Sequence, residues 1–429
     1  MTKKFEGKKL LVLGSNVGSI DIVKYARCEG AYTIVADYLP PEKSPAKVVA
    51  NEHWLISTTD INTLYEKCIE YHIDGIFAGV SEINLISSMQ LSEMLGLRFY
   101  CNKEQWDLIE NKASFRTLCE KFSVPCPHTY YTGGMLEDKQ YATINYPVVL
   151  KPVDGSSSIG VVICNDESEL RISIQDSITK SATGKVIIEE YFDGDEFSAH
   201  YTISDGKISF SCIDNRYPIM VNEGYVTSIP VARIYPSSFI ESYSSQVNKR
   251  VIEMIDSLNL NTGVLFVQGL YDKHQDKFVI FEAGLRSAGE APYRFINHIN
   301  GINYMENIID YILLGHGVID LAKDDPFFHG NYCALISIVT KGGTIGYMSN
   351  IEDILAQYKD IVDYECRYKV GDATPSGNTL RQIMIRFAII GRSIDELKHI
   401  IRDMNERVVV LDIEGNNMCL KFNVDNLDN

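Results

Sequence analysis

The sequence predicts an α/β protein that begins with a parallel sheet and continues with antiparallel sheets. In residues 1–100, short apolar runs alternate with segments of helical periodicity, as in KKLLVLG followed by SIDIVKYARCEG. This alternation is typical of β–α–β units, whose parallel sheet is covered by helices on both faces. From about residue 330 strand patterns follow one another closely, as in NYCALISIVTKGGTIGYM, which favours an antiparallel sheet with flanking helices.

The first half of the chain contains two expected units. Residues 1–102 form a Rossmann-like unit with strands at 8–14, 31–37 and 74–80 and helices at 19–30, 61–73 and 82–96. Residues 103–188 form a second unit with two helical segments up to Val124-Pro125, a strand at 146–154, a helix at 166–180 and a strand from 185.

The second half contains two more. In residues 189–325 we expect strands in FSAHYTISDGKISFS, a helix at 249–258, the strand pair LNTGVLFVQGLYD and DKFVIFEAG, and a helix in INGINYMENIIDYILLG. In residues 326–429 we expect strands in NYCALISIVTKGGTIGYM, IVDYECRYKVGDAT and RQIMIRFAIIG, the helix SIDELKHIIRDMNERV, and the strands VVVLDI and CLKFNV.

The turn GSNVGS at 14–19 imitates a dinucleotide-binding fingerprint, because it follows a strand and Asp37 ends the next strand. That fingerprint requires a glycine where Asn16 stands, so that the backbone can approach a pyrophosphate closely. The two interpretations are an NAD site and a tight turn in a Rossmann-like sheet, and the missing glycine favours the turn. The loop can still line a substrate cleft, because open sheets bind ligands beyond the carboxyl ends of their strands.

The composition is that of a soluble globular protein, with 45% hydrophobic and 23% charged residues. The net charge of −17 argues against nucleic-acid binding, which needs a cationic surface, but not against a nucleotide pocket. We find neither a signal peptide nor an apolar run long enough to span a bilayer. The ten cysteines are scattered without a C-x-x-C pair, which predicts free thiols in a reducing cytoplasm.

The segment VVLKPVDGSSSIGVV, residues 148–162, is the strongest local pattern. Lys151 lies near the end of an apolar strand, where burial is costly unless the ammonium faces an anion. The loop that follows is rich in small hydroxyl residues, whose N–H and O–H groups can fold over phosphates. The alternative is a hairpin turn with a lysine that extends to solvent, and a Walker loop is absent.

Two further segments carry carboxylates at strand ends. VIIEEYFDGDEFS contains Glu189 and Glu190 at the end of one strand and Glu196 at the start of the next. Such a segment could bind adenine through its backbone and ribose through a carboxylate, although acidic strand ends are more often simply solvated.

In FVQGLYDKHQDKFVIFEAGLR, a tight turn allows Gln268 and Glu282 to face each other across a hairpin. Two oxygen ligands on rigid strands suit Mg²⁺ when phosphates and water complete its octahedron. Arg286 would then contact phosphate or a substrate carboxylate. The alternative is a polar strand pair on the surface of a sheet.

Taken in order, these motifs resemble those of the ATP-grasp carboxylate–amine ligases, which include biotin carboxylase, carbamoyl-phosphate synthetase and the amino-acid ligases. The resemblance covers residues from about 8 to 315 and can be extended to the whole chain. It implies an ATP-grasp fold with an amino-terminal Rossmann-like domain, a flexible lid at about 120–188 and a carboxy-terminal antiparallel lobe.

The resemblance also implies roles for individual residues and two cofactors, ATP and Mg²⁺, for which Mn²⁺ can substitute. The nucleotide-binding positions are Lys112, Lys151, Ser156, Ser157, Ser158, Glu189, Glu190, Tyr191, Phe192 and Glu196. The metal ligands are Gln268 and Glu282, and Lys151 and Arg286 are the catalytic residues, Arg286 matching the arginine of the family's E-x-N-x-R pattern.

One position departs from that pattern, because Gly284 stands where the family has asparagine. A side-chain oxygen for a second Mg²⁺ is therefore missing. The glycine allows three interpretations: Glu282 bridges both metal ions, one metal ion binds weakly, or the chain is a non-catalytic relative. The other motifs are intact and favour retained activity.

The implied reaction is ATP-dependent activation of a small carboxylate as an acyl phosphate, which an amine then attacks, with release of ADP and phosphate. Arg286, Arg216 and Arg294 are candidates to hold the substrate carboxylate, with surface salt bridges as the alternative for the last two, and His200 is expected to pack within its strand. An amino acid is the leading substrate, and bicarbonate is the alternative. The remaining rival is a non-catalytic ATP-binding protein, and dimers are common in the family.

Overall fold

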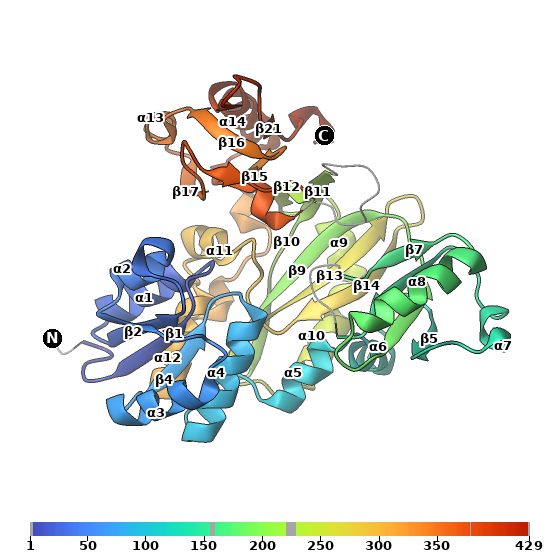
Figure 1. The fold of residues 1–429 in the computed structure, drawn as a ribbon, viewed down its shortest axis with the longest axis horizontal. Coiled ribbons are helices and arrows are strands. Elements are labelled where there is room, and N and C mark those ends of the chain that lie inside the picture. Colours follow the sequence, from blue (N-terminus) through green and yellow to red (C-terminus); the bar gives the residue numbers. More distant parts are fainter. Residues whose placement is uncertain (1–2, 155–158, 220–228, 378, 428–429) are drawn as a thin grey trace.

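A parallel sheet forms the amino-terminal part of the molecule, coloured blue in Figure 1. The computed structural model describes residues 3–154, 159–219, 229–377 and 379–427. The sheet has the order β3-β2-β1-β4 and consists of β1 (Lys9–Leu13), β2 (Tyr32–Asp37), β3 (Glu52–Leu55) and β4 (Gly75–Ala78). Its helices are α1 (Ser19–Cys28), α2 (Pro45–Val49), α3 (Ile61–Tyr71) and α4 (Glu82–Leu95). The expected Rossmann-like arrangement is confirmed, with β3 as a strand that we did not predict.

The turn after β1 serves to tie strand ends together. The Asn16 side chain accepts a hydrogen bond from the Val80 N–H at 2.9 Å, which joins this turn to the end of β4. Asp37 is buried and engaged by Lys47 Nζ at 2.9 Å and by Ser44 Oγ at 2.6 Å. These contacts occupy the groups that a dinucleotide would use, in agreement with a tight turn.

A small antiparallel sheet lies at the opposite end of the molecule, coloured green in Figure 1. It is reached through α5 (Lys103–Glu110) and α6 (Lys112–Lys121). Its order is β5-β8-β6-β7, with β5 (Thr129–Gly133), β6 (Val148–Pro152), β7 (Val162–Cys164) and β8 (Val186–Glu190), and it carries α7 (Asp138–Tyr141) and α8 (Glu167–Thr179). Leu150, Leu170 and Ile174 belong to a hydrophobic core of its own.

A second antiparallel sheet forms the centre of the molecule. Its order is β10-β9-β13-β14, with β9 (Asp195–Ser204), β10 (Lys207–Ile213), β13 (Gly263–Asp272) and β14 (Lys277–Gly284). It is accompanied by α9 (Ile240–Tyr243), α10 (Lys249–Asp256) and α11 (Tyr293–Asn300). The helix α12 (Tyr304–Leu314) packs on both the central and the parallel sheets, because Ile312 and Leu313 lie against Gly75.

The carboxy-terminal lobe, at the top of Figure 1, is antiparallel as expected. Its main sheet has the order β11-β12-β15-β19-β17, with β11 (Asn215–Ile219), β12 (Ile229–Tyr235), β15 (Tyr332–Thr340), β17 (Ile361–Cys366) and β19 (Ile383–Gly391), and β21 (Cys419–Leu420) added to β15. A smaller sheet contains β16 (Gly343–Met348), β18 (Ala373–Thr374) and β20 (Val410–Asp412), and the helices are α13 (Ile351–Leu355) and α14 (Ile394–Arg407).

The unit boundary expected at residue 326 does not coincide with a sheet boundary, because β12 pairs with β15 and β11 pairs with β12, and both strands precede residue 326. The lobe therefore takes two strands from the unit expected at 189–325.

None of the helices in the described part of the chain combines the length and hydropathy needed to cross a bilayer. All ten cysteines are free thiols.

Candidate active site

The central sheet places two oxygen-bearing side chains opposite each other. Gln268 on β13 is in register with Glu282 on β14, as the tight turn between the strands led us to expect. The Gln268 amide nitrogen donates to Ser198 Oγ at 3.3 Å, which leaves the amide oxygen as the atom able to bind a metal. Glu282 is 35% exposed, and Lys112 Nζ lies 4.0 Å from its Oε1. The pair thus offers side-chain oxygen atoms from two residues, the ligand type that Mg²⁺ prefers.

A buried carboxylate, Glu189, lies between two cations. Lys151 Nζ is 2.5 Å from Glu189 Oε2, and Arg116 pairs with the same carboxylate through Nε and, at 3.3 Å, through Nη2. Val149 on β6 is in register with Glu189 on β8, so Lys151 lies diagonally across from Glu189 on the same face. Arg116 also donates to the carbonyl of Phe281 in β14 and so joins the green sheet to the central one.

Burial and charge act in opposite directions on the pKa values of this triad. Burial alone would raise the pKa of the Glu189 carboxyl, but Lys151 and Arg116 outweigh it and hold that pKa below its ordinary value. Burial lowers the pKa of Lys151, while Glu189 opposes that shift. Glu189 is 1% exposed, and both of its carboxylate oxygens are engaged by Arg116 or Lys151, so its side chain helps to position Lys151.

Three cations therefore gather beside two carboxylates. Lys112, Arg116 and Lys151 lie beside Glu189 and Glu282, so among these five described groups the cations outnumber the carboxylates. Such an excess suits an anion with several charged oxygens, because the anion would restore neutrality in a medium of low dielectric constant.

Helix α6 sets the position of Lys112, which is its first residue. The Asn111 side chain caps this helix by accepting from the N–H groups of Ala113 and Ser114. The backbone N–H of Lys112 donates to the Val153 carbonyl at 3.0 Å, which fixes the helix start against the strand that carries Lys151.

The expected adenine linker follows β8. Glu190 is exposed, and the Tyr191 N–H donates to the Pro147 carbonyl at 3.2 Å. The Phe192 N–H has no hydrogen-bond acceptor in the described residues. This donor is therefore available to a ligand or to water. The use of this linker for adenine stays a prediction. Ser156, Ser157 and Ser158 lie outside the described residues.

The three candidate arginines have different surroundings. Arg216 forms an ion pair with Glu196, the residue expected to bind ribose. Arg294 pairs with Asp363 and, at 3.2 Å, with Asp21, so it joins β17 to α1.

Arg286 differs from the other two candidates in forming no ion pair with a carboxylate of the described residues. Its Nη1 is 3.4 Å from the Ser287 carbonyl, and its Nε is buried without an acceptor in the described part of the chain. Glu110 lies near it and accepts the Leu285 N–H at 3.0 Å. Burial raises the pKa of Glu110 to about 7, and the charge of Arg286 opposes that shift. Arg286 is therefore the arginine best placed to receive an anionic group.

Several buried charged residues at this site were not predicted from the sequence. Arg233 donates to Ser198 Oγ at 3.1 Å and pairs with both Asp214 and Glu290, the latter at 3.1 Å. Arg116 could have been found, because it lies one helical turn after Lys112 and thus on the same face of α6. Glu290 follows Arg286 by four residues, whereas nothing local distinguished Arg233 or Asp214.

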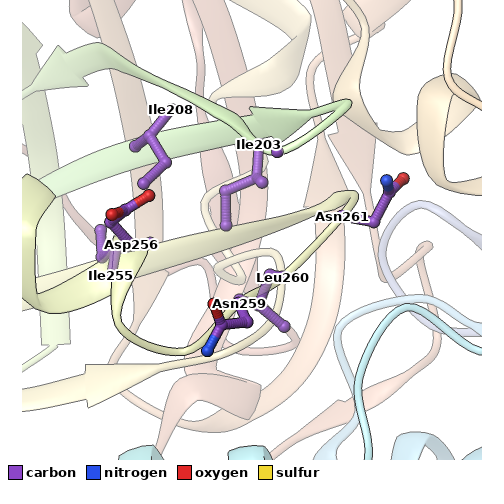
Figure 2. A pocket seen from close by; sticks show the side chains of 8 residues that line it. Ile203, Ile208, Ile255, Asp256, Asn259, Leu260 and Asn261 are labelled. Atoms are coloured by element: carbon purple, nitrogen blue, oxygen red, sulfur yellow. The ribbon is translucent and has the colours of Figure 1, made fainter.

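A separate hollow of about 270 Å³ lies between the β9–β10 hairpin and the end of α10. Figure 2 shows that Ile203, Ile208, Ile255 and Leu260 form its apolar part, and Asp256, Asn259 and Asn261 are the polar residues that it labels. None of the predicted site residues lines this hollow.

Comparison with known proteins gives a family match and distant relatives. Residues 144–292 match the family model of the ATP-grasp domain, a range that contains Lys151, Glu189, Gln268, Glu282 and Arg286. The formate-dependent phosphoribosylglycinamide formyltransferase of Sulfurisphaera tokodaii is 28% identical over 263 residues, which are 59% of this chain and 62% of that protein. The carbamoyl phosphate synthase large chain of Clostridium beijerinckii is 22% identical over 341 residues, 74% of this chain and 30% of that protein. The chain thus spans less than two thirds of these curated relatives.

Solved structures resemble the chain over nearly its whole length. The L-amino acid ligase from Bacillus licheniformis superposes with a TM-score of 0.76 at 17% identity, covering 95% of this chain and 99% of that one. Phosphoribosylglycinamide synthetase from Anaerococcus prevotii superposes with a TM-score of 0.73 at 16% identity, covering 94% and 99%. At these identities the likeness concerns the fold.

Proposed function

We propose that this chain, whose residues 144–292 match the ATP-grasp domain and whose fold is that of the ATP-grasp structures, is an ATP-dependent ligase. The enzyme would activate a small carboxylate as an acyl phosphate, which an amine attacks to form a C–N bond with release of ADP and phosphate. The observation that carries the proposal is the group of three cations beside the Gln268–Glu282 oxygen pair.

The nucleotide would lie between the green sheet and the central sheet. Lys112 and Lys151 would bind its phosphates. The ion pair with Glu189 would favour the charged form of Lys151 and hold its ammonium group in position. The backbone of Glu190 to Phe192 would bind adenine, and Glu196 would bind ribose while Arg216 orients its carboxylate.

Gln268 and Glu282 would hold Mg²⁺ or Mn²⁺. When bound, this ion would neutralise charge on the transferred phosphoryl group. Arg286 would stabilise the charge that develops on the acyl phosphate and on the tetrahedral species that follows the attack of the amine. Of the three arginines, Arg286 is therefore the one that we assign to the substrate.

The test is a coupled assay of ADP release with a panel of carboxylates and amines. The panel contains amino acids, formate and bicarbonate, each with and without an amine acceptor. ADP release that needs one carboxylate and one amine supports the ligase. Strict dependence on bicarbonate would move the assignment to a bicarbonate-phosphorylating enzyme. Tight binding of Mg·ATP without turnover by any pair would leave a non-catalytic nucleotide-binding protein.

Variants connect the assay to the site. We expect Lys112→Met to lower the rate of ADP release by about 100-fold or more, because one stabilising charge is lost from a buried site. Lys103→Met is the matched control, since Lys103 is the exposed first residue of the neighbouring helix α5. Equal rates for the two variants would remove Lys112 from the proposed site.

A further inference from the structure

Two rows of side chains cross the central sheet next to each other. Ser198, Gln268 and Glu282 form one row, because Gln268 is in register with both of the others. Phe266 in turn is in register with His200 on β9 and Gly284 on β14, which makes the second row. Residues two apart on a strand point to the same face, so the second row lies on the same face as the proposed metal ligands.

The ring of Phe266 fills the space that a side chain at position 284 would need. A Cβ atom on Gly284 would lie 2.5 Å from both Cε1 and Cζ of Phe266, which is well inside van der Waals contact. The ring itself has little room to move, because Phe266 is 4% exposed and its centroid lies 6.0 Å from that of the His200 ring. The absence of a side chain at 284 is thus matched by a bulky neighbour.

The charges around this ring are also unfavourable to a second cation. The Arg286 guanidinium carbon lies 5.2 Å from the centroid of Phe266. Lys112 Nζ lies 4.0 Å from Glu282 Oε1 and adds a second positive charge beside that carboxylate. A second divalent ion beside Glu282 would meet an apolar ring and a guanidinium in place of an oxygen ligand. In the described part of the chain, no group of three or more His, Cys, Asp or Glu residues could hold a metal elsewhere.

We propose that the active site takes a single divalent cation with its nucleotide, held by Gln268 and Glu282, and that Phe266 and Gly284 together exclude a second. This inference rests on the proposed function, since the cation arrives with ATP. More than a metal ligand is missing here. The Phe266 ring occupies the space that a side chain at position 284 would need, and the positive charge of Arg286 lies next to that ring.

The stoichiometry of Mn²⁺ tests the inference. The wild-type protein is kept in excess over a non-hydrolysable ATP analogue, and bound Mn²⁺ is measured from the loss of the free-ion EPR signal. We expect one Mn²⁺ for each bound nucleotide, and two would overturn the inference. The affinity for the analogue is measured separately by calorimetry. If the analogue does not bind at all, the proposed function fails, and the inference fails with it.

Three variants examine the role of the ring. Gly284→Asn alone should still bind one Mn²⁺ and should melt at a lower temperature, because the new side chain meets Phe266. Phe266→Ala alone should also bind one. The double variant Phe266→Ala/Gly284→Asn has both the space and the amide oxygen, so we expect a second Mn²⁺ there. Two Mn²⁺ in Gly284→Asn alone, or one in a folded double variant that retains nucleotide affinity, would contradict the role given to Phe266.

Discussion

Glu189 has to remain ionised although solvent hardly reaches it. The cost of burying its charge is offset by Lys151 and Arg116, and the cost of burying those cations is offset by Glu189. The removal of one member therefore leaves the others without compensation.

We predict that Glu189→Gln lowers the free energy of unfolding by about 3 to 5 kcal/mol, the range for a broken buried ion pair. Chemical denaturation at pH 7 measures this change. Glu190→Gln, one residue further along β8 and exposed, should change it by no more than about 0.5 kcal/mol. A small effect at position 189 would show that the triad is open to solvent.

His200 is a second residue whose burial has a measurable consequence. Burial lowers its pKa to about 4, with the charge of Glu290 opposing the shift and that of Arg233 supporting it. Glu290 Oε1 lies 3.8 Å from Nε2, and neither ring nitrogen has a hydrogen-bond partner in the described residues. The imidazole is therefore neutral in the folded protein at neutral pH.

The pH dependence follows from the sign of this shift. The folded pKa lies below the unfolded value of about 6.5, so the unfolded chain binds more protons and stability falls as the pH falls from 6.5 towards 4. Between pH 7 and pH 5 we expect His200 to account for a loss of about 2 kcal/mol. His200→Leu should remove this part of the decline. The difference between the wild-type and variant profiles is the quantity to compare, because the raised pKa of Glu110 acts in the opposite direction in both proteins.

At the scale of single elements, the capped start of α6 combines a structural and a functional role. The Asn111 cap satisfies two N–H groups at the start of the helix, and the next residue is Lys112. Asn102 caps α5 in the same way, through the Gln105 N–H, but the residue after it is exposed.

This pair of caps allows a controlled comparison. Asn111→Ala and Asn102→Ala should each lower the free energy of unfolding by about 1 kcal/mol. Only Asn111→Ala should weaken binding of an ATP analogue, because it loosens the position of Lys112. Denaturation and calorimetry on the same samples measure both quantities. An equal loss of affinity in both variants would show that the effect comes from general destabilisation.

The elements also show what could be inferred from the sequence. The β13–β14 hairpin and its Gln268–Glu282 register were predictable, because alternation and a tight turn are local properties that set a register. The pairing of β12 with β15 was not, since about a hundred residues separate the strands and no local pattern specifies a distant partner. Arg233 and Asp214 could not be predicted for the same reason, since their partners are distant in the sequence. Lys151 could be predicted, because the pattern around it is local.

At the scale of the whole molecule, the hydrophobic interior is divided. The green sheet has its own core, and the carboxy-terminal lobe has another, while the main core joins the parallel and central sheets. A small separate core gives a part of the structure that can open without the rest. The proposed nucleotide site lies where the green sheet meets the central one.

Hydrogen exchange followed by mass spectrometry should report this division. Without nucleotide, we expect amides in residues 129–190 to exchange faster than those of the parallel and central sheets. An ATP analogue at a concentration of about 100 times its Kd should slow their exchange by up to about 100-fold. The part of the carboxy-terminal lobe from β15 onward is the internal control, and its exchange should not change. Uniform slowing across the chain would contradict the division into separate cores.

The fit between Phe266 and Gly284 limits the order in which these positions can change during evolution. An asparagine gained first at 284 would collide with the ring. An alanine gained first at 266 would leave a cavity, with a cost of about 3 to 5 kcal/mol. Either route passes through a less stable protein, so the two positions should be inherited together. Descendants of this chain are expected to keep both residues or to have replaced both.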